Sequence, residues 1–180
     1  MDQYLLTRLE YDRAVDAGAF RPGARLELIE GKLHAMTPQG TAHTTGLHLV
    51  ANYLREAFGP GHVIRIQNPL AIGDYSEPEP DIAVVAGNVR DYRHVHPTAA
   101  HLVVEVAQTS LADDRIVKQA LYASCGIPEY WILAIPEDRL EVYREPEGDR
   151  YRCVKHLVAG DQVAPLARPD ALVAVEDLLP

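Results

Sequence analysis

The chain has 180 residues, of which 47% are hydrophobic and 24% are charged. This length fits one domain of ~100 to 200 residues, and the apolar content is enough for a core, which excludes a disordered chain. The formal net charge of -9 excludes binding to nucleic acid through overall attraction, because that binding needs Lys and Arg opposite phosphates. A nucleic-acid enzyme of this composition must concentrate its positive charge locally.

The sequence contains no recognisable targeting or membrane segment. No apolar run reaches the ~18 residues of a membrane span, and Met1 to Tyr4 lacks the basic and apolar regions of a secretion signal. We therefore expect a cytoplasmic protein with no membrane partner. Cys125 and Cys153 are too few and too far apart to indicate a disulfide framework or a zinc site, so we expect two buried thiols.

The first half of the chain alternates between helical and extended patterns. Thr7-Arg8-Leu9-Glu10 has the form of a capping box and predicts a helix that ends at Gly18. Two apolar alternations around Glu30-Gly31 predict a hairpin, and apolar residues at three- and four-residue steps after it predict an amphipathic helix. The expected ranges are 7–18 and 41–58 for the helices, 25–29 and 32–36 for the hairpin, and 62–72 and 81–85 for two further strands.

The second half adds one helix and four strands. Ser110 or Thr109 is a candidate cap for the helix, and Gly126 follows as its stop. The expected ranges are 101–106, 129–135, 140–144 and 151–157 for the strands, 111–124 for the helix, and 175–179 for a short closing segment. This order predicts an α/β fold of the mixed α+β kind: one domain over residues 1–180, with a central mixed β-sheet flanked by helices and an N-terminal hairpin.

Two acidic residues interrupt strands that are otherwise apolar. Asp81 opens the run Pro80-Asp81-Ile82-Ala83-Val84-Val85, and Glu105 lies inside Leu102-Val103-Val104-Glu105-Val106-Ala107. A carboxylate in such a strand is buried or half-buried and needs a partner. A divalent cation is the simplest partner for two carboxylates together, because it offsets both their desolvation and their mutual repulsion. The alternative is that Glu105 faces water on an edge strand or pairs with a basic residue.

The helix that follows carries Asp114, Lys118 and Tyr122 at four-residue spacing, so these side chains share one face. Lys118 could therefore point back toward the ends of the strands. The alternative is an exposed Asp114–Lys118 ion pair, which stabilises a helix by only a few tenths of a kcal/mol.

At this level of detail the sequence resembles the bacterial family of putative restriction endonucleases, once classed only as a domain of unknown function, within the PD-(D/E)XK nuclease superfamily. The resemblance spans most of the chain, and Gly126-Ile127-Pro128-Glu129-Tyr130-Trp131-Ile132 is its most specific part. The other matching positions are Leu26 to Leu33, His43, Pro80-Asp81, Leu102 to Val106, Asp114, Lys118 and Tyr122.

The resemblance implies that Asp81 and Glu105 bind Mg²⁺ or Mn²⁺ and that Lys118 acts as the motif lysine. The standard lysine of the superfamily lies two residues after the second acid, where this chain has Ala107. The family resembles a variant in which the lysine has moved to the following helix, which is where Lys118 lies.

Three further positions match the family with less definite roles. Glu27 is either an additional acid near the metal or a brace for the hairpin, and His43 is either part of the site or a structural histidine of the helix. Gln108 stands where relatives usually have serine, which changes the local hydrogen bonding.

The function that these features predict is a divalent-metal-dependent endonuclease that hydrolyses phosphodiester bonds, with DNA as the expected nucleic-acid partner. Homodimerisation is an expectation from the way such nucleases cut two strands. One alternative is a catalytically inactive binding or regulatory module with the nuclease fold, which Ala107 and the acidic balance favour. A second alternative is a metal-dependent hydrolase of small phosphoesters.

Overall fold

The computed structural model describes residues 3–180. Its centre is a six-stranded sheet with the order β3-β4-β5-β6-β7-β8, in which β5 and β6 are parallel and the other neighbours are antiparallel. The strands are β3 (His62–Ile66), β4 (Ile82–Ala86), β5 (Leu102–Ala107), β6 (Glu129–Ala134), β7 (Arg139–Glu147) and β8 (Arg150–Val158). This arrangement confirms the predicted mixed α/β fold.

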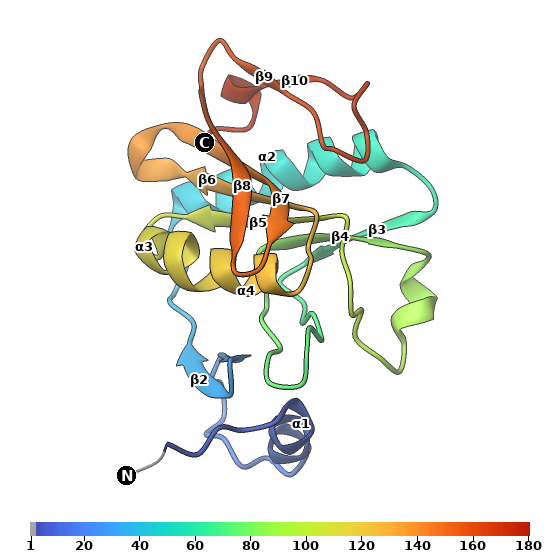
Figure 1. The fold of residues 1–180 in the computed structure, drawn as a ribbon, viewed down its shortest axis with the longest axis vertical. Coiled ribbons are helices and arrows are strands. Elements are labelled where there is room, and N and C mark those ends of the chain that lie inside the picture. Colours follow the sequence, from blue (N-terminus) through green and yellow to red (C-terminus); the bar gives the residue numbers. More distant parts are fainter. Residues whose placement is uncertain (1–2) are drawn as a thin grey trace.

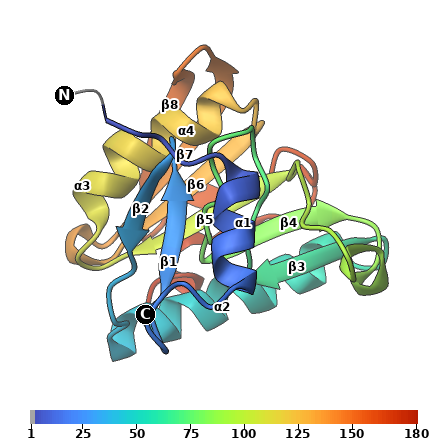
Figure 2. The same ribbon diagram turned by 90° about the horizontal axis from the view of Figure 1, so that it is seen from below.

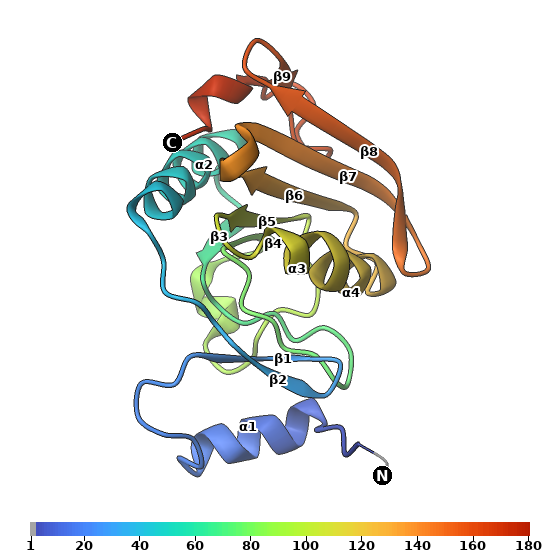
Figure 3. The same cartoon turned by 90° about the vertical axis from the view of Figure 1, so that its left-hand side faces the viewer.

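Helices cover both faces of the sheet (Figure 3). One face is covered by α2 (Thr41–Phe58), and the other by α3 (Leu111–Asp113), the π-helical segment η2 (Asp114–Lys118) and α4 (Gln119–Ser124). Each face has its own hydrophobic core. The short remaining elements are η1 (Val89–Tyr92), η3 (Ile135–Glu137), β9 (Gln162–Val163), β10 (Val173–Ala174) and η4 (Val175–Asp177).

Strand β5 explains why Glu105 meets the second helical layer. All six residues of β5 are buried, as expected for a strand covered on both faces. Val104 and Val106 pack in the core beneath α2, whereas Val103 and Ala107 pack in the core beneath α4. Because side chains alternate along a strand, Glu105 points toward the α3–α4 side.

The N-terminal part forms a separate layer at one end of the molecule, where α1 (Arg8–Asp16) lies against the hairpin of β1 (Leu26–Ile29) and β2 (Lys32–Ala35) (Figures 1 and 2). The capping box at Thr7 and the hairpin turn are confirmed. Glu30 and Gly31 have positive φ angles of 48° and 77°, as a type I′ turn requires. The hairpin is joined to the main body by a pair of backbone hydrogen bonds between Leu28 and Glu77.

The prediction of one strand over 62–72 is wrong in its length. Strand β3 ends at Ile66, and Gln67 adopts a positive φ of 50°. A non-glycine residue in this conformation leaves the extended geometry of the strand, and Pro69 two residues later cannot donate to a ladder. The kink places the Gln67 side chain next to Asp81.

The helix predicted over 111–124 forms, but not as a regular α-helix. Between Asp114 and Lys118 it widens to a π turn, and the Gln119 N–H donates to the carbonyl of Asp114, five residues earlier. Single π turns of this kind are frequent at functional sites. Ser110 is the N-cap, but its hydroxyl donates to the Asp114 carboxylate and accepts no capping hydrogen bond from a backbone N–H of the helix.

Two smaller expectations can be compared with the structure. Cys125 and Cys153 are each partly exposed, so the expectation of two buried thiols is wrong. Within residues 3–180, the structure contains no helix with the length and apolar character of a membrane span.

The burial of Glu77, in the loop that pairs with β1, should make the stability of the folded protein depend on pH. Its side chain is buried, and burial raises its pKa to about 7. Its ionisation in the folded protein is therefore unfavourable, so the free energy of unfolding should fall as the pH rises from about 4.5 to 7. We compare the free energy of unfolding of Glu77→Gln with that of the parent protein at each pH. After allowance for solvent screening, we expect this difference to be about 1–2 kcal/mol more in favour of the variant at pH 8 than at pH 4.5.

Urea denaturation of both proteins at the two pH values measures this difference. Glu56→Gln, at an exposed position of α2, is the matched control and should show no such change. An equal effect of Glu77→Gln at both pH values would show that the Glu77 carboxyl does not titrate in this way.

Candidate active site

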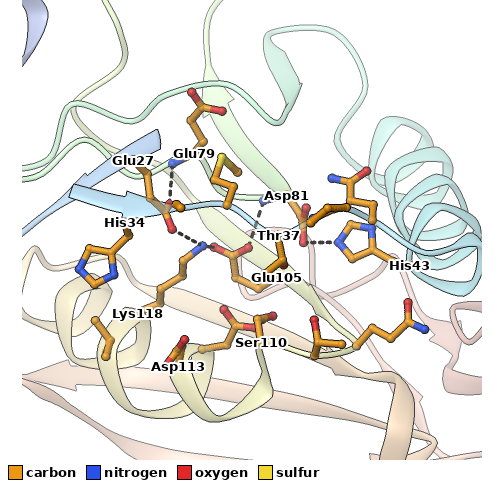
Figure 4. Close-up of a pocket in the computed structure, with 18 of the residues that line it drawn as sticks. Glu27, His34, Thr37, His43, Glu79, Asp81, Glu105, Ser110, Asp113 and Lys118 are labelled. Atoms are coloured by element: carbon orange, nitrogen blue, oxygen red, sulfur yellow. Dashed lines mark hydrogen bonds and ion pairs between the residues drawn. The ribbon is translucent and has the colours of Figure 1, made fainter. Parts of the chain in front are cut away.

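A cleft of about 340 Å³ lies between the β1–β2 hairpin and the α3–η2 helix, with the adjoining ends of β4 and β5 at its floor (Figure 4). The structure brings every candidate residue to this cleft. Its lining includes Glu27, His43, Asp81, Glu105, Gln108 and Lys118.

Asp81 lies directly before β4 and is 8% exposed. Its Oδ2 accepts a hydrogen bond of 2.8 Å from the Val106 N–H and lies 3.0 Å from Nε2 of His43, which α2 carries. Its Oδ1 accepts a hydrogen bond of 3.0 Å from Gln67. Burial acts to raise the Asp81 pKa, but these hydrogen bonds outweigh it and hold the pKa below its ordinary value. Asp81 is therefore an anion at neutral pH.

Glu105 is 3% exposed and lies on the neighbouring strand. Its Oε2 accepts a hydrogen bond of 3.2 Å from the backbone N–H of Asp81, and its Oε1 accepts one of 2.8 Å from the hydroxyl of Tyr122. Burial raises the Glu105 pKa, and the nearby Lys118 ammonium opposes that rise. The two acids are therefore in direct contact, because the backbone of Asp81 is hydrogen-bonded to the side chain of Glu105.

Lys118 extends from the π turn into the cleft, and its side chain is 12% exposed. Its Nζ donates to Glu105 Oε1 at 3.1 Å and lies 3.4 Å from Glu27 Oε1. Burial acts to lower the Lys118 pKa, but the adjacent carboxylates of Glu105 and Glu27 hold it above its ordinary value. The alternative of an exposed Asp114–Lys118 pair does not describe this lysine, because both side chains are directed into the protein.

Glu27 and Gln108 occupy opposite sides of the cleft. Glu27 Oε2 accepts a hydrogen bond of 3.2 Å from the Glu79 N–H, so this side chain both braces the hairpin and reaches Lys118. Gln108 is exposed at the rim and packs over Gly40, the N-cap of α2. A Cβ at position 40 would lie 2.6 Å from Gln108 Oε1, so a glycine allows this approach.

Two polar side chains of the site were missed by sequence analysis. Gln67 holds Asp81, but it was placed within a regular strand and carried no signal of its own. The sequence predicts Asp114 as a helix-face residue and a position that matches the family, but not its burial; it lies in the cleft wall, where burial raises its pKa to about 6. Its carboxylate accepts a hydrogen bond of 2.6 Å from Ser110, which the spacing of four residues could have suggested.

The donor set of Asp81 and Glu105 fits a hard divalent cation. A carboxylate has about four acceptor positions, and within residues 3–180 each of these two acids uses three. One position therefore remains on Asp81 Oδ1 and one on Glu105 Oε2. Mg²⁺ is usually held by one or two carboxylates and keeps several waters. In the same residues, no three His, Cys, Asp or Glu side chains are already grouped as metal ligands.

Comparison with solved structures gives the fold. The chain is similar to a protein from Anabaena variabilis ATCC 29413, described as a putative nuclease belonging to DUF820, with a TM-score of 0.75 and 18% sequence identity. The match covers 96% of this chain and 97% of the other. The chain therefore shares the fold of that protein, a mixed sheet with helices on both faces.

Comparison with protein families gives a more specific assignment. The model of the Uma2 family, described as "Putative restriction endonuclease", matches residues 8–176. The chain belongs to this family, and the resemblance inferred from sequence is confirmed. A search of curated proteins found no match. Family and fold together support a nuclease.

Proposed function

We propose that the protein is a divalent-metal-dependent endonuclease that hydrolyses phosphodiester bonds in DNA, with Asp81 and Glu105 as the ligands of Mg²⁺ or Mn²⁺. The observation that carries this proposal is the meeting of two buried acids from adjacent strands beside a buried ammonium group. When bound, the cation would supply Lewis-acid stabilisation of charge on the phosphate and activation of water.

The side chain of Lys118 provides the positive charge of the cleft. Its pKa lies above the ordinary value, so it acts as a hydrogen-bond donor and not as a base. An ammonium group has three N–H donors, of which two face Glu105 and Glu27. The third can orient a water molecule or a phosphate oxygen, which is the form of electrostatic stabilisation that phosphoryl chemistry requires.

His43 is a positioning residue in this proposal. Since ionised Asp81 can only accept, His43 Nε2 donates to it and fixes the orientation of the carboxylate. Loss of such an outer hydrogen bond typically costs ~10- to 100-fold in metal affinity or activity. We expect His43→Ala to lower Mn²⁺ affinity by about that factor, and His43→Asn to restore part of it.

Titration of Mn²⁺ into the three proteins, with cleavage rates measured in parallel, tests the role of His43. His48→Ala, at an exposed position of the same helix, is the control and should bind Mn²⁺ as the parent protein does. Unchanged Mn²⁺ affinity in His43→Ala would remove His43 from the site.

The proposed function itself is tested with the purified protein and a panel of substrates. Plasmid, linear duplex DNA, single-stranded DNA and RNA are incubated with Mg²⁺, Mn²⁺ or EDTA. We expect cleavage of DNA at internal bonds that depends on the added cation. Hydrolysis of small phosphoesters without cleavage of any nucleic acid would contradict the proposal, and so would cleavage that persists unchanged in EDTA.

A further inference from the structure

The reacting groups lie at the bottom of a narrow cleft between two walls. The hairpin and residues 36–40 form one wall, and residues 108–118 form the other (Figure 4). A volume of about 340 Å³ is at the lower end of the ~300 to 1,000 Å³ range of small-molecule pockets. The space beside Asp81 and Glu105 therefore accommodates roughly one nucleotide at a time.

The two walls are attached to each other across this space. Lys118, on the helical wall, lies 3.4 Å from Glu27 on the hairpin wall. The hairpin is in turn held by the backbone pairing of Leu28 with Glu77 and by the hydrogen bond from Glu79 N–H to Glu27. Opening the cleft to admit a wide ligand would break a buried ion pair, which is strongly unfavourable because it leaves an uncompensated charge.

The charges of the cleft do not match the phosphate array of a double helix. Duplex DNA presents one phosphate charge per ~1.7 Å of its axis, and tight duplex binding requires several Lys or Arg side chains. Lys118 is the only Lys or Arg in the cleft lining, within the part of the chain that the structure describes. The lining carries six carboxylates, those of Glu27, Glu79, Asp81, Glu105, Asp113 and Asp114.

Several arginines elsewhere are already used in the fold. Arg115 and Arg139 pair with the buried Glu141, and Arg144 pairs with the buried Glu129. These arginines neutralise buried glutamates within the fold and are therefore not available to bind phosphates.

The walls do offer contacts for a single strand. Apolar side chains face the cleft beside the acids, and these could contact a base; they are Ile29, Ala35, Met36, Pro38 and Val117. Lys32 is exposed on β2, directly opposite Ile29, and so lies on the same face of the hairpin as the lining residues. It adds a positive charge to the hairpin face that lines the cleft.

We propose that the substrate is single-stranded DNA, or an unpaired segment within duplex DNA, threaded between the hairpin and the helical wall. This inference rests on the proposed nuclease function and specifies its substrate. One unstacked nucleotide enters the cleft with its phosphate toward Asp81 and Glu105, while its neighbours remain outside.

Three labelled DNAs of one sequence test this inference: a 40-nucleotide single strand, the corresponding duplex, and a duplex with a 10-nucleotide gap. With Mn²⁺, we expect the single strand and the gapped DNA to be cut at least about 20-fold faster than the duplex, with cuts confined to the gap. Equal cleavage of the intact duplex would overturn the inference and leave the nuclease function standing.

Fluorescence anisotropy of the same DNAs with Ca²⁺ in place of Mn²⁺ separates binding from cleavage. We expect the single strand to bind at least about tenfold more tightly than the duplex. Preferential binding of the single strand without cleavage in Mn²⁺ would contradict the nuclease function but support the substrate class. If the protein neither prefers the single strand nor cleaves any of the DNAs, both the substrate class and the nuclease function are overturned.

Substitution of Lys32 tests whether the single strand enters the cleft past the hairpin. A charge reversal, Lys32→Glu, should weaken single-strand binding about fivefold and reduce the slope of log affinity against log salt by ~0.7 or more. Lys155→Glu, at an exposed position of β8, makes the same change in net charge and should alter binding less than twofold. Equal effects of the two variants would show that the strand does not enter past the hairpin.

Discussion

Asp81→Asn is expected to lower the rate of DNA cleavage by about 10³-fold or more while the protein stays folded. The substitution keeps the shape of the side chain and removes its negative charge. Its amide oxygen can still accept from Val106 N–H and from His43, and the amide of Gln67 can turn to accept from the new NH₂ group. The loss is large because an uncharged amide binds a hard cation weakly, and the cation stabilises the charge of the transition state.

The matched control for this variant is Asp113→Asn. Asp113 also lines the cleft, but it is exposed on the helix. The same change from aspartate to asparagine is therefore made there without altering the two acids at the floor. We expect its cleavage rate to remain within about threefold of the parent rate. Comparable rates in Asp81→Asn and the parent protein would exclude Asp81 from catalysis.

Lys118→Met is the second substitution with a large expected effect. Methionine fills the volume of the aliphatic chain but offers no donor and no charge, so the transition state loses its ammonium partner. We expect cleavage to fall about 10²- to 10³-fold, which is the usual cost of one such donor. Mn²⁺ affinity should be unchanged or higher, because the positive charge beside Glu105 is gone.

This split between cleavage and cation binding distinguishes Lys118 from Asp81, whose substitution should reduce both. Single-turnover cleavage and Mn²⁺ titration on the same preparation measure the two quantities. Lys155→Met is the control for loss of one lysine at an exposed position. Full activity of Lys118→Met would mean that Lys118 serves only to neutralise Glu27 and Glu105.

The positions of the two acids could be predicted because they conflict with their local pattern. Asp81 and Glu105 interrupt valine-rich strands, and the four-residue spacing placed Lys118 and Tyr122 on the helix face that meets Glu105. Both helix residues do contact that carboxylate. The prediction holds in spite of the π turn, because the turn changes the start of the helix and leaves α4 regular beyond Lys118.

The same signal alone could not separate catalytic acids from structural ones. Glu129 and Glu141 are also buried acids in apolar strands, but each is compensated by arginine: Arg144 for Glu129, and Arg115 for Glu141. These pairings join residues that are 15 and 26 positions apart, so no local pattern reveals them. The local pattern therefore made Asp81 and Glu105 candidates, and the resemblance to a family supported their assignment as metal ligands.

Contacts made by loops were beyond the reach of sequence patterns. The positive φ of Gln67, which turns its side chain toward Asp81, depends on packing after β3 and has no glycine to mark it. The contact between Glu27 and Lys118 joins the hairpin to the helix across 91 residues of sequence, and it closes the cleft only in the folded chain.

Calorimetric titration of Mn²⁺ into the full chain, compared with the Glu105→Gln variant, tests the central claim most directly. If two carboxylates share one cation, the parent protein should bind about one Mn²⁺ at this site, and Glu105→Gln should lose at least about tenfold in affinity. The same Mn²⁺ affinity and stoichiometry in both proteins would contradict the account, because Glu105 would then take no part in holding a metal.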